Sequence, residues 1–363
     1  MKWWYARVAG LIARGYQPPT APRPAVDWVF PAPAGDGQLI VFCPTVTIAG
    51  NERPQAEAVL QFAAHLRNGL EGGTLPPCLL LLGVYHTPEH RDEAVARLHA
   101  LRECLDTSPV PLAAFCTTAP GKVTAFNVAI DLALRSRAVG LLQLDDDIHL
   151  ADGAIETLYA AYRAAGRPLA VGAAKVGVPR PSQTSHLMRW SKRHTRTAVN
   201  YPHACCILLD PRLLAPGVPA RYVSDDGYIC FALLRPELPD PLCLLRLVPE
   251  ARCVHYVGGP AGQAIRRVRG ILLSVHVFLA DFPAEVSRYY FREILFPGFW
   301  PLGSPPPRRQ PLSWVLQALY FAWFAAVGLE LALRGACGRP LRDIGWAPVQ
   351  DRALPEATRA ARA

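Results

Sequence analysis

The sequence predicts an α/β protein whose centre is a mostly parallel sheet with helices on both faces. Between residues 39 and 144, short aliphatic runs alternate with longer segments of helical spacing, the pattern of repeated strand–helix–strand units. The aliphatic runs are nearly continuous, as expected for strands that are buried on both faces. The last run leads directly into three carboxylates, Asp145, Asp146 and Asp147.

The expected elements follow from the length and spacing of these segments. Aliphatic runs of strand length cover residues 39–43, 78–84, 112–116 and 139–144. Segments with apolar residues at helical spacing lie between them, over residues 52–67, 89–105 and 122–135. The second half is less regular, and there we expect strands over 169–174 and 205–209 and helices over 226–234 and 263–278.

Composition divides the chain into four parts. Residues 1–36 combine an amphipathic segment with a linker rich in Pro and Ala. Residues 37–282 form the predicted α/β domain, and residues 283–334 form a helical region rich in aromatic and apolar side chains, which we expect to associate with a membrane. Residues 335–363 form a polar tail.

The charge and cysteine content restrict the possible partners and the compartment. The net charge is +9, with 38 Lys and Arg against 29 Asp and Glu, which suits an anionic membrane surface or a nucleotide diphosphate. No nucleic-acid-binding module is recognisable, so a nucleic-acid partner is not expected. The ten cysteines form no Cys-x-x-Cys pair, which favours reduced thiols and a cytoplasmic α/β domain.

Two segments favour association with a membrane. Residues 312–333 are long enough to span a bilayer, and Gln317 and Glu330 are their strongly polar interruptions. Arginines flank the segment on both sides, so an interfacial or re-entrant helix competes with a transmembrane one. Residues 1–16 are basic and aromatic, and they suit either a membrane interface or a helix docked on the protein itself.

The three consecutive aspartates are the first candidate site. Open α/β sheets bind ligands at the carboxyl ends of their strands, and clustered carboxylates repel one another unless a cation is present. If the chain stays extended, Asp145 and Asp147 lie on the same face and can bind one ion. Mg²⁺ or Mn²⁺ suits such oxygen ligands. A solvated acidic turn is the alternative.

Two further groups of polar residues precede predicted helices. Lys122, after Gly121, is placed where its charge and a helix N-terminus could meet a phosphate, and Asn127, about one turn further on, could face the same site. An exposed lysine is the alternative for Lys122. Pro44 and Thr45, with Glu52 at the next helix, are candidates for contacts to a nucleotide base or ribose, although an ordinary helix start explains them as well.

Two more groups lie in the second half of the chain. Asp225 and Asp226 begin a predicted helix, where a carboxylate could cap the helix or could act as a general base toward an acceptor hydroxyl. Further along, three residues share one side of a predicted helix and suit a leaving diphosphate: Gln263, Arg266 and Arg267.

The order of these motifs resembles the family 2 glycosyltransferases of GT-A fold. The shared features, over residues 38–280, are GKxxxFN at 121–127, DxD at 145–147, an acidic pair at 225–226 and QxxR at 263–266. Members of that family are inverting enzymes that use nucleotide sugars, and membrane-associated polysaccharide and glycolipid synthases of the cell envelope are among them.

The resemblance implies a role for each matching residue. It places Lys122 near the nucleotide, Asp145 and Asp147 on the metal, and Asp226 as the catalytic base. It also places the motif of Gln263, Arg266 and Arg267 beside the acceptor and the diphosphate. His255 lies where some GT-A enzymes supply another metal ligand, with an ordinary packed histidine as the alternative.

Three departures from the family pattern leave open which nucleotide base is bound and whether transfer is processive. Pro44 and Thr45 are separated from Asn51 and Glu52, and residues 83–87 contain no acid that could contact the base. Arg267 replaces a tryptophan of the family motif, which removes support for processive polymerisation. The alternatives are a GT-A-like nucleotidyltransferase and a catalytically silent, membrane-associated nucleotide-binding subunit. The expected acceptor is a lipid-linked or glycan hydroxyl.

Overall fold

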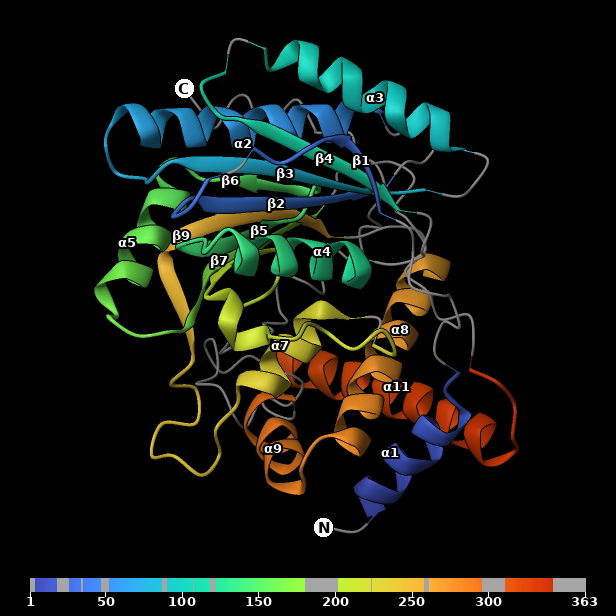
Figure 1. Cartoon of the computed structure of the whole chain (residues 1–363). Coiled ribbons are helices and arrows are strands. Elements are labelled where there is room, and N and C mark those ends of the chain that lie inside the picture. The colour runs from blue at the N-terminus through green and yellow to red at the C-terminus, as the bar shows by residue number, and fades with distance from the viewer. Residues whose placement is uncertain are drawn as a thin grey trace.

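A mixed sheet of nine strands forms the centre of the described part of the chain (Figure 1). In this computed structural model the strand order is β1-β4-β3-β2-β5-β8-β7-β9-β6. The structure describes residues 4–17, 26–33, 35–46, 52–86, 90–106, 108–117, 122–179, 202–222, 224–257, 261–295 and 311–341.

The first half of the chain folds as the strand and helix pattern predicts. Its strands are β2 (Leu39–Val46), β3 (Cys78–Tyr85), β4 (Leu112–Thr117) and β5 (Gly140–Leu144). Its helices are α2 (Glu52–Glu71), α3 (Arg91–Cys104) and α4 (Lys122–Arg135). β2 pairs in parallel with both β3 and β5, and β3 pairs in parallel with β4. The predicted parallel centre of the sheet is therefore confirmed.

The outer strands make the sheet mixed. They are β1 (Val26–Phe30), β6 (Ile148–Leu150), β7 (Ala170–Pro179), β8 (Cys206–Leu209) and β9 (Leu245–Val257). β7 and β8 confirm two predicted strands, and β8 runs antiparallel to both β5 and β7. β1 corrects the prediction of a linker, because residues 26–30 add an antiparallel edge strand to β4. β6, β9 and the helix α5 (Ala154–Ala164) were not predicted.

Two cores cover the two faces of the sheet. Alternate residues of β2 separate between them: Leu39, Val41 and Cys43 pack with α2, α3 and α5, whereas Ile40 and Phe42 pack with α4. Figure 1 shows α2 and α3 on one side of the sheet and α4 on the other. Because successive side chains of a strand point to opposite faces, a continuous aliphatic strand supplies both cores.

A layer of helices lies beyond α4 (Figure 1). It contains α7 (Asp225–Leu233), α8 (Ala261–Asp281), α9 (Ala284–Tyr289), the π-helical turn Tyr290–Leu295, α11 (Pro311–Ala336) and, from the N-terminus, α1 (Trp4–Gly15). α1 packs on α8 and α11, so a large part of its surface is docked on the protein itself. A side chain at Gly335 would collide with the backbone oxygen of Leu11, so the glycine permits this close packing.

No helix among the described residues is long and apolar enough to cross a membrane. The transmembrane interpretation of residues 312–333 is therefore not supported. α11 instead buries Phe324, Val327 and Leu331 in the core that it shares with α1 and α8.

Candidate active site

The candidate site lies where the strand order of the sheet reverses. The chain moves outward from β2 through β3 to β4, and α4 then returns it to β5 on the opposite side of β2. Ligands of open α/β sheets bind at the carboxyl ends of the strands beside such a switch point. Thr45 lies at the end of β2, and Asp145 directly follows β5, so both flank this position.

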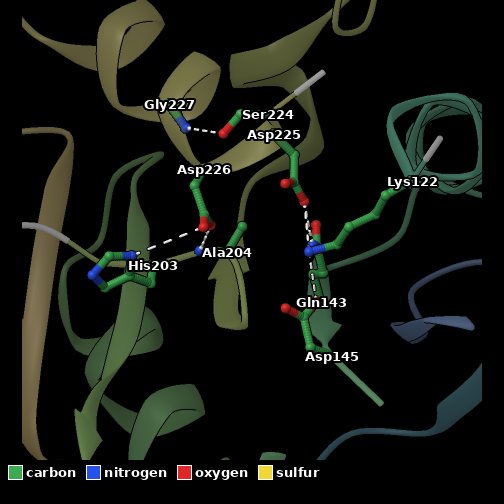
Figure 2. A network of polar contacts seen from close by, with 9 residues as sticks. All are labelled: Lys122, Gln143, Asp145, His203, Ala204, Ser224, Asp225, Asp226 and Gly227. Carbon is green, nitrogen blue, oxygen red and sulfur yellow. Dashed lines mark hydrogen bonds and ion pairs between the residues drawn. The ribbon is translucent and has the colours of Figure 1, made fainter. Parts of the chain in front are cut away.

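One lysine connects two of the predicted motifs here. Lys122 Nζ, from the first turn of α4, lies 2.6 Å from Asp145 Oδ1 and 2.9 Å from Asp225 Oδ2 (Figure 2). Gln143, inside β5, donates from Nε2 to the same Asp225 oxygen at 2.6 Å. We call these four residues the lysine–carboxylate cluster. Lys122 is not the exposed lysine of the alternative interpretation, because only 21% of its side chain is accessible.

The cluster perturbs the charges that it contains. Burial raises the pKa of Asp145, and the neighbouring Asp147, Asp225 and Asp226 act in the same direction; together they outweigh Lys122 and bring that pKa to about 7. Burial alone would lower the pKa of Lys122, but the neighbouring carboxylates outweigh it and hold that pKa well above its ordinary value. A lysine that is shared between two buried carboxylates leaves negative charge in excess.

Two buried oxygens at this site, one of them on a member of the cluster, have no hydrogen-bond partner within the described ranges. They are Thr45 Oγ1, at the end of β2, and Gln143 Oε1, in β5. Thr45 is 6% exposed, and Gln143 is fully buried. Buried polar atoms are nearly always paired, so two unpaired acceptors at a switch point fit a ligand or cation that completes them.

The turn after β5 differs from the extended chain that the sequence analysis assumed. The chain turns at Asp146 and Asp147 before β6 begins at Ile148, so alternation does not place Asp145 and Asp147 on one face. Asp146 is 7% exposed, whereas Asp147 is exposed. Of these two turn residues, Asp146 is therefore the buried one. In an extended chain its side chain would instead point to the face opposite Asp145 and Asp147.

Asp226 points away from the cluster. Its Oδ1 accepts a hydrogen bond from the backbone N–H of Ala204, and its Oδ2 lies 3.9 Å from His203 Nδ1 (Figure 2). Burial opposes ionisation of Asp226, but His203, Lys122 and Lys175 outweigh it, so the pKa of this carboxyl lies well below its ordinary value. About a third of the side chain, 35%, remains accessible.

Neither carboxylate of the acidic pair is the N-cap of α7, because the residue before the pair takes that role. Ser224 is the N-cap of α7, and its Oγ accepts from the N–H of Gly227 at 3.2 Å. Asp225 contacts Lys122 and Gln143, and Asp226 contacts the segment before β8. The two carboxylates are thus directed to different sides of the site.

Asn127 does not join the cluster. Its Nδ2 donates to the Val218 carbonyl and its Oδ1 accepts from the Val218 N–H, both at 2.7 Å. Both polar atoms of the amide are therefore occupied, and Asn127 fixes the backbone near residue 218. Asn127 lies five residues after Lys122, about 500° around the helix, so the two side chains point about 140° apart.

The pairing of β6 with β9 brings His255 close to the aspartates. His255 lies opposite Ile148, the residue after Asp147, and its Nδ1 lies 3.2 Å from the Val176 carbonyl oxygen. Within the described ranges, no three His, Cys, Asp or Glu side chains are gathered as a metal-binding group. The predicted set of Asp145, Asp147 and His255 is therefore near the same sheet edge but is not assembled as ligands.

For most of the remaining predicted residues, the structure describes the position of the backbone but not that of the side chain. Pro44 pairs with Gly83 of β3, and Glu52 begins α2. Gln263, Arg266 and Arg267 lie in the first two turns of α8, and the side chains of these three residues and of Glu52 are outside the described part of the structure.

Sequence reasoning missed Gln143 and His203. Gln143 gives a usable signal, because it is the one polar residue in the aliphatic run 141–144. His203 gives none, because its proximity to Asp226 depends on how the segment before β8 meets α7. In comparisons with known proteins, no family model matches the chain and no curated protein matches it significantly.

Proposed function

We propose that this chain is a metal-dependent inverting glycosyltransferase of the GT-A type. It would move a sugar from a nucleotide-sugar donor to an acceptor hydroxyl, on a lipid-linked or glycan acceptor. The observation that carries the proposal is the lysine–carboxylate cluster at the switch point of the sheet, with a second, more accessible carboxylate, Asp226, beside it. The resemblance of the four motifs to family 2 supports the same function.

The donor side of the site is the carboxyl edge of β2 and β5. Here, within the described ranges, Thr45 Oγ1 and Gln143 Oε1 are buried without a hydrogen-bond partner, which fits a bound ligand. The excess of carboxylates favours a cation. Asp145 and Asp147, with His255 nearby, are not gathered as ligands in this structure, but they are the residues that would hold Mg²⁺ or Mn²⁺, and the ion would neutralise charge on the departing nucleoside diphosphate. Oxygen donors from carboxylates fit these hard ions, although the ion must share Asp145 with Lys122.

Lys122 holds the site together when the donor is absent and can meet the diphosphate when it is present. Its ammonium is paired with Asp145 and Asp225, and a bound cation at Asp145 would release part of that pairing. Arg266 and Arg267, in the first turns of α8, are proposed as further partners of the diphosphate. Charge-assisted hydrogen bonds to phosphate oxygens would stabilise the leaving group.

The acceptor side is Asp226. Asp226 is ionised at neutral pH, as a proton acceptor must be, although its lowered pKa makes it a weaker base than an ordinary aspartate. The acceptor oxygen forms a bond to the anomeric carbon, while the bond from that carbon to the diphosphate oxygen breaks. The electron pair leaves with the nucleoside diphosphate, and the hydroxyl proton passes to Asp226. Attack from the face opposite the leaving group inverts the anomeric centre.

A thermal-shift screen of nucleotide sugars, with and without Mn²⁺, tests donor binding. We expect at least one nucleotide sugar to raise the melting temperature in a Mn²⁺-dependent way, because ligand binding stabilises the folded state by mass action. A panel without any metal-dependent shift would contradict the proposal. A nucleotide sugar that raises the melting temperature but is neither hydrolysed nor transferred would favour the catalytically silent nucleotide-binding subunit.

A further inference from the structure

The outward face of α11 carries an unusual concentration of exposed aliphatic side chains. The described residues include nine large apolar side chains that are exposed, and four of them lie on this helix: Val315 at 55%, Leu319 at 61%, Leu329 at 60% and Leu333 at 58%. At about 100° per residue, these four side chains fall within an arc of about 80°. We call this line of side chains the apolar stripe.

The opposite face of α11 is fixed to the protein. Phe324, Val327 and Leu331 are buried in the core with α1 and α8, and they lie on the side of the helix away from the stripe. Arg269 of α8 binds Glu330 with hydrogen bonds of 2.6–3.1 Å. The stripe is therefore held outward by a packed and ion-paired helix.

Positive charge accompanies the stripe at one end. Gly15, the last residue of α1, packs against Gly335 of α11, which brings Arg14 and Arg334 to the same end of the helix pair. Both arginines are exposed, as is Arg339. The sequence of α1 contains no acid, and that of α11 contains only Glu330, which Arg269 and Arg334 share.

An anionic lipid surface fits this combination better than a second copy of the chain. A second copy packed stripe against stripe would cover the leucines, but α1 has no acid and the one acid of α11 is already paired, so these helices would bring no counter-charge for the arginines, whereas anionic headgroups attract them. The stripe runs from Val315 to Leu333, about 27 Å of helix, and among the described side chains of α11 the large apolar ones on the opposite side are buried. A helix of that kind lies in the plane of a membrane interface.

We propose that α11 rests on an anionic membrane surface, with the apolar stripe among the headgroups and upper acyl chains and with Arg14, Arg334 and Arg339 near lipid phosphates. The rest of the chain then stands on the α1–α11 layer. This surface is independent of the transferase chemistry, so lipid binding can fail while donor binding succeeds, and the reverse.

Vesicle flotation of the full chain tests the proposal. We expect the protein to float with vesicles that contain phosphatidylglycerol and phosphatidylcholine, to float less with phosphatidylcholine alone, and to dissociate as salt rises. The double variant Leu319→Gln/Leu329→Gln should bind anionic vesicles at least about tenfold more weakly, because two apolar contacts are lost. A matched control is Leu238→Gln, at another exposed leucine (44%), between α7 and β9.

The outcomes separate the occupants of the stripe. The substituted leucines are exposed, so the variants should keep the wild-type melting curve. Equal binding by the double variant and the control, or no binding of the wild type to anionic vesicles, would overturn the proposal. A wild-type dimer in sedimentation velocity that the double variant loses would assign the stripe to a second copy instead.

Discussion

The two sides of the candidate site are built differently. On the proposed donor side, Lys122 is tightly paired with Asp145 and Asp225, at 2.6 and 2.9 Å, and 21%, 23% and 7% of these three side chains are accessible. On the acceptor side, Asp226 is one-third accessible and lies 3.9 Å from His203. A closely paired cluster resists rearrangement, whereas an accessible carboxylate can meet a hydroxyl. Under the proposed function, the first group would support structure and donor binding, and the second would take the proton of the acceptor hydroxyl.

The largest expected effect separates these two roles. Asp226→Asn should reduce sugar transfer by about 10²–10⁴-fold, because a general base is lost. The asparagine can still accept from Ala204, so donor affinity and the melting temperature should remain nearly unchanged. Steady-state turnover with direct titration of the donor checks this. Wild-type turnover in the variant would remove Asp226 from its proposed role.

The second prediction concerns the lysine that joins the motifs. Lys122→Met leaves Asp145 and Asp225 without their shared cation, and breaking a buried ion pair typically costs about 3–5 kcal/mol. Denaturant unfolding should show that loss. Arg91→Met is the control, because Arg91 and Asp27 form an exposed pair that should contribute little. Equal, small effects of both substitutions would show that the cluster is not a stabilising unit.

Pairing within that cluster can be isolated with a double-mutant cycle. Asp225→Asn removes one of the two charges that Lys122 faces, so the cost of Lys122→Met should be smaller in the Asp225→Asn background than in the wild type. Additive effects would mean that the two residues act independently.

Asn127 gives the third test, because the sequence analysis placed it in the donor site. Asn127→Ala should destabilise the protein by about 1–3 kcal/mol, since Val218 loses a partner for both its N–H and its carbonyl. Donor affinity should not change when measured at a temperature where the variant is folded. Weaker donor binding with normal stability would restore the original prediction.

The smallest expected effect concerns the pH dependence of the acceptor side. His203, with Lys122 from α4 and Lys175 from β7, lowers the pKa of Asp226, whereas burial raises it. His203→Gln removes the nearest of these groups, so Asp226 should become protonated at a higher pH. The acidic limb of the kcat/KM profile should then move toward neutral pH, with a loss of only several-fold at the optimum. An unmoved limb would show that His203 does not influence Asp226.

Local patterns predicted the fold best where neighbouring residues determine it. The aliphatic runs ending at Cys43 and Leu144 and the helix that begins at Lys122 lie where periodicity placed them. β1 and β9 were missed, because an edge strand and an extra strand are stabilised by partners distant in sequence.

The sequence predicted which residues belong to the candidate site better than it predicted which of them contact one another. Strand ends and helix starts marked Lys122, Asp145 and the acidic pair as candidates, and the resemblance to the glycosyltransferase family implied that they share one site. No spacing rule could show that Asp225 faces Lys122, that Asp226 faces Ala204, or that the chain turns at Asp146. Those details depend on long-range packing and on the turn after β5.

Product analysis tests the central proposal most directly. The full chain should be incubated with Mn²⁺, the nucleotide sugar that stabilises it and a panel of lipid-linked and glycan acceptors, and the products separated by chromatography. The account predicts release of the nucleoside diphosphate in equal amount to a glycoside of inverted anomeric configuration. Release of pyrophosphate with a new nucleotide conjugate would contradict it and identify a nucleotidyltransferase.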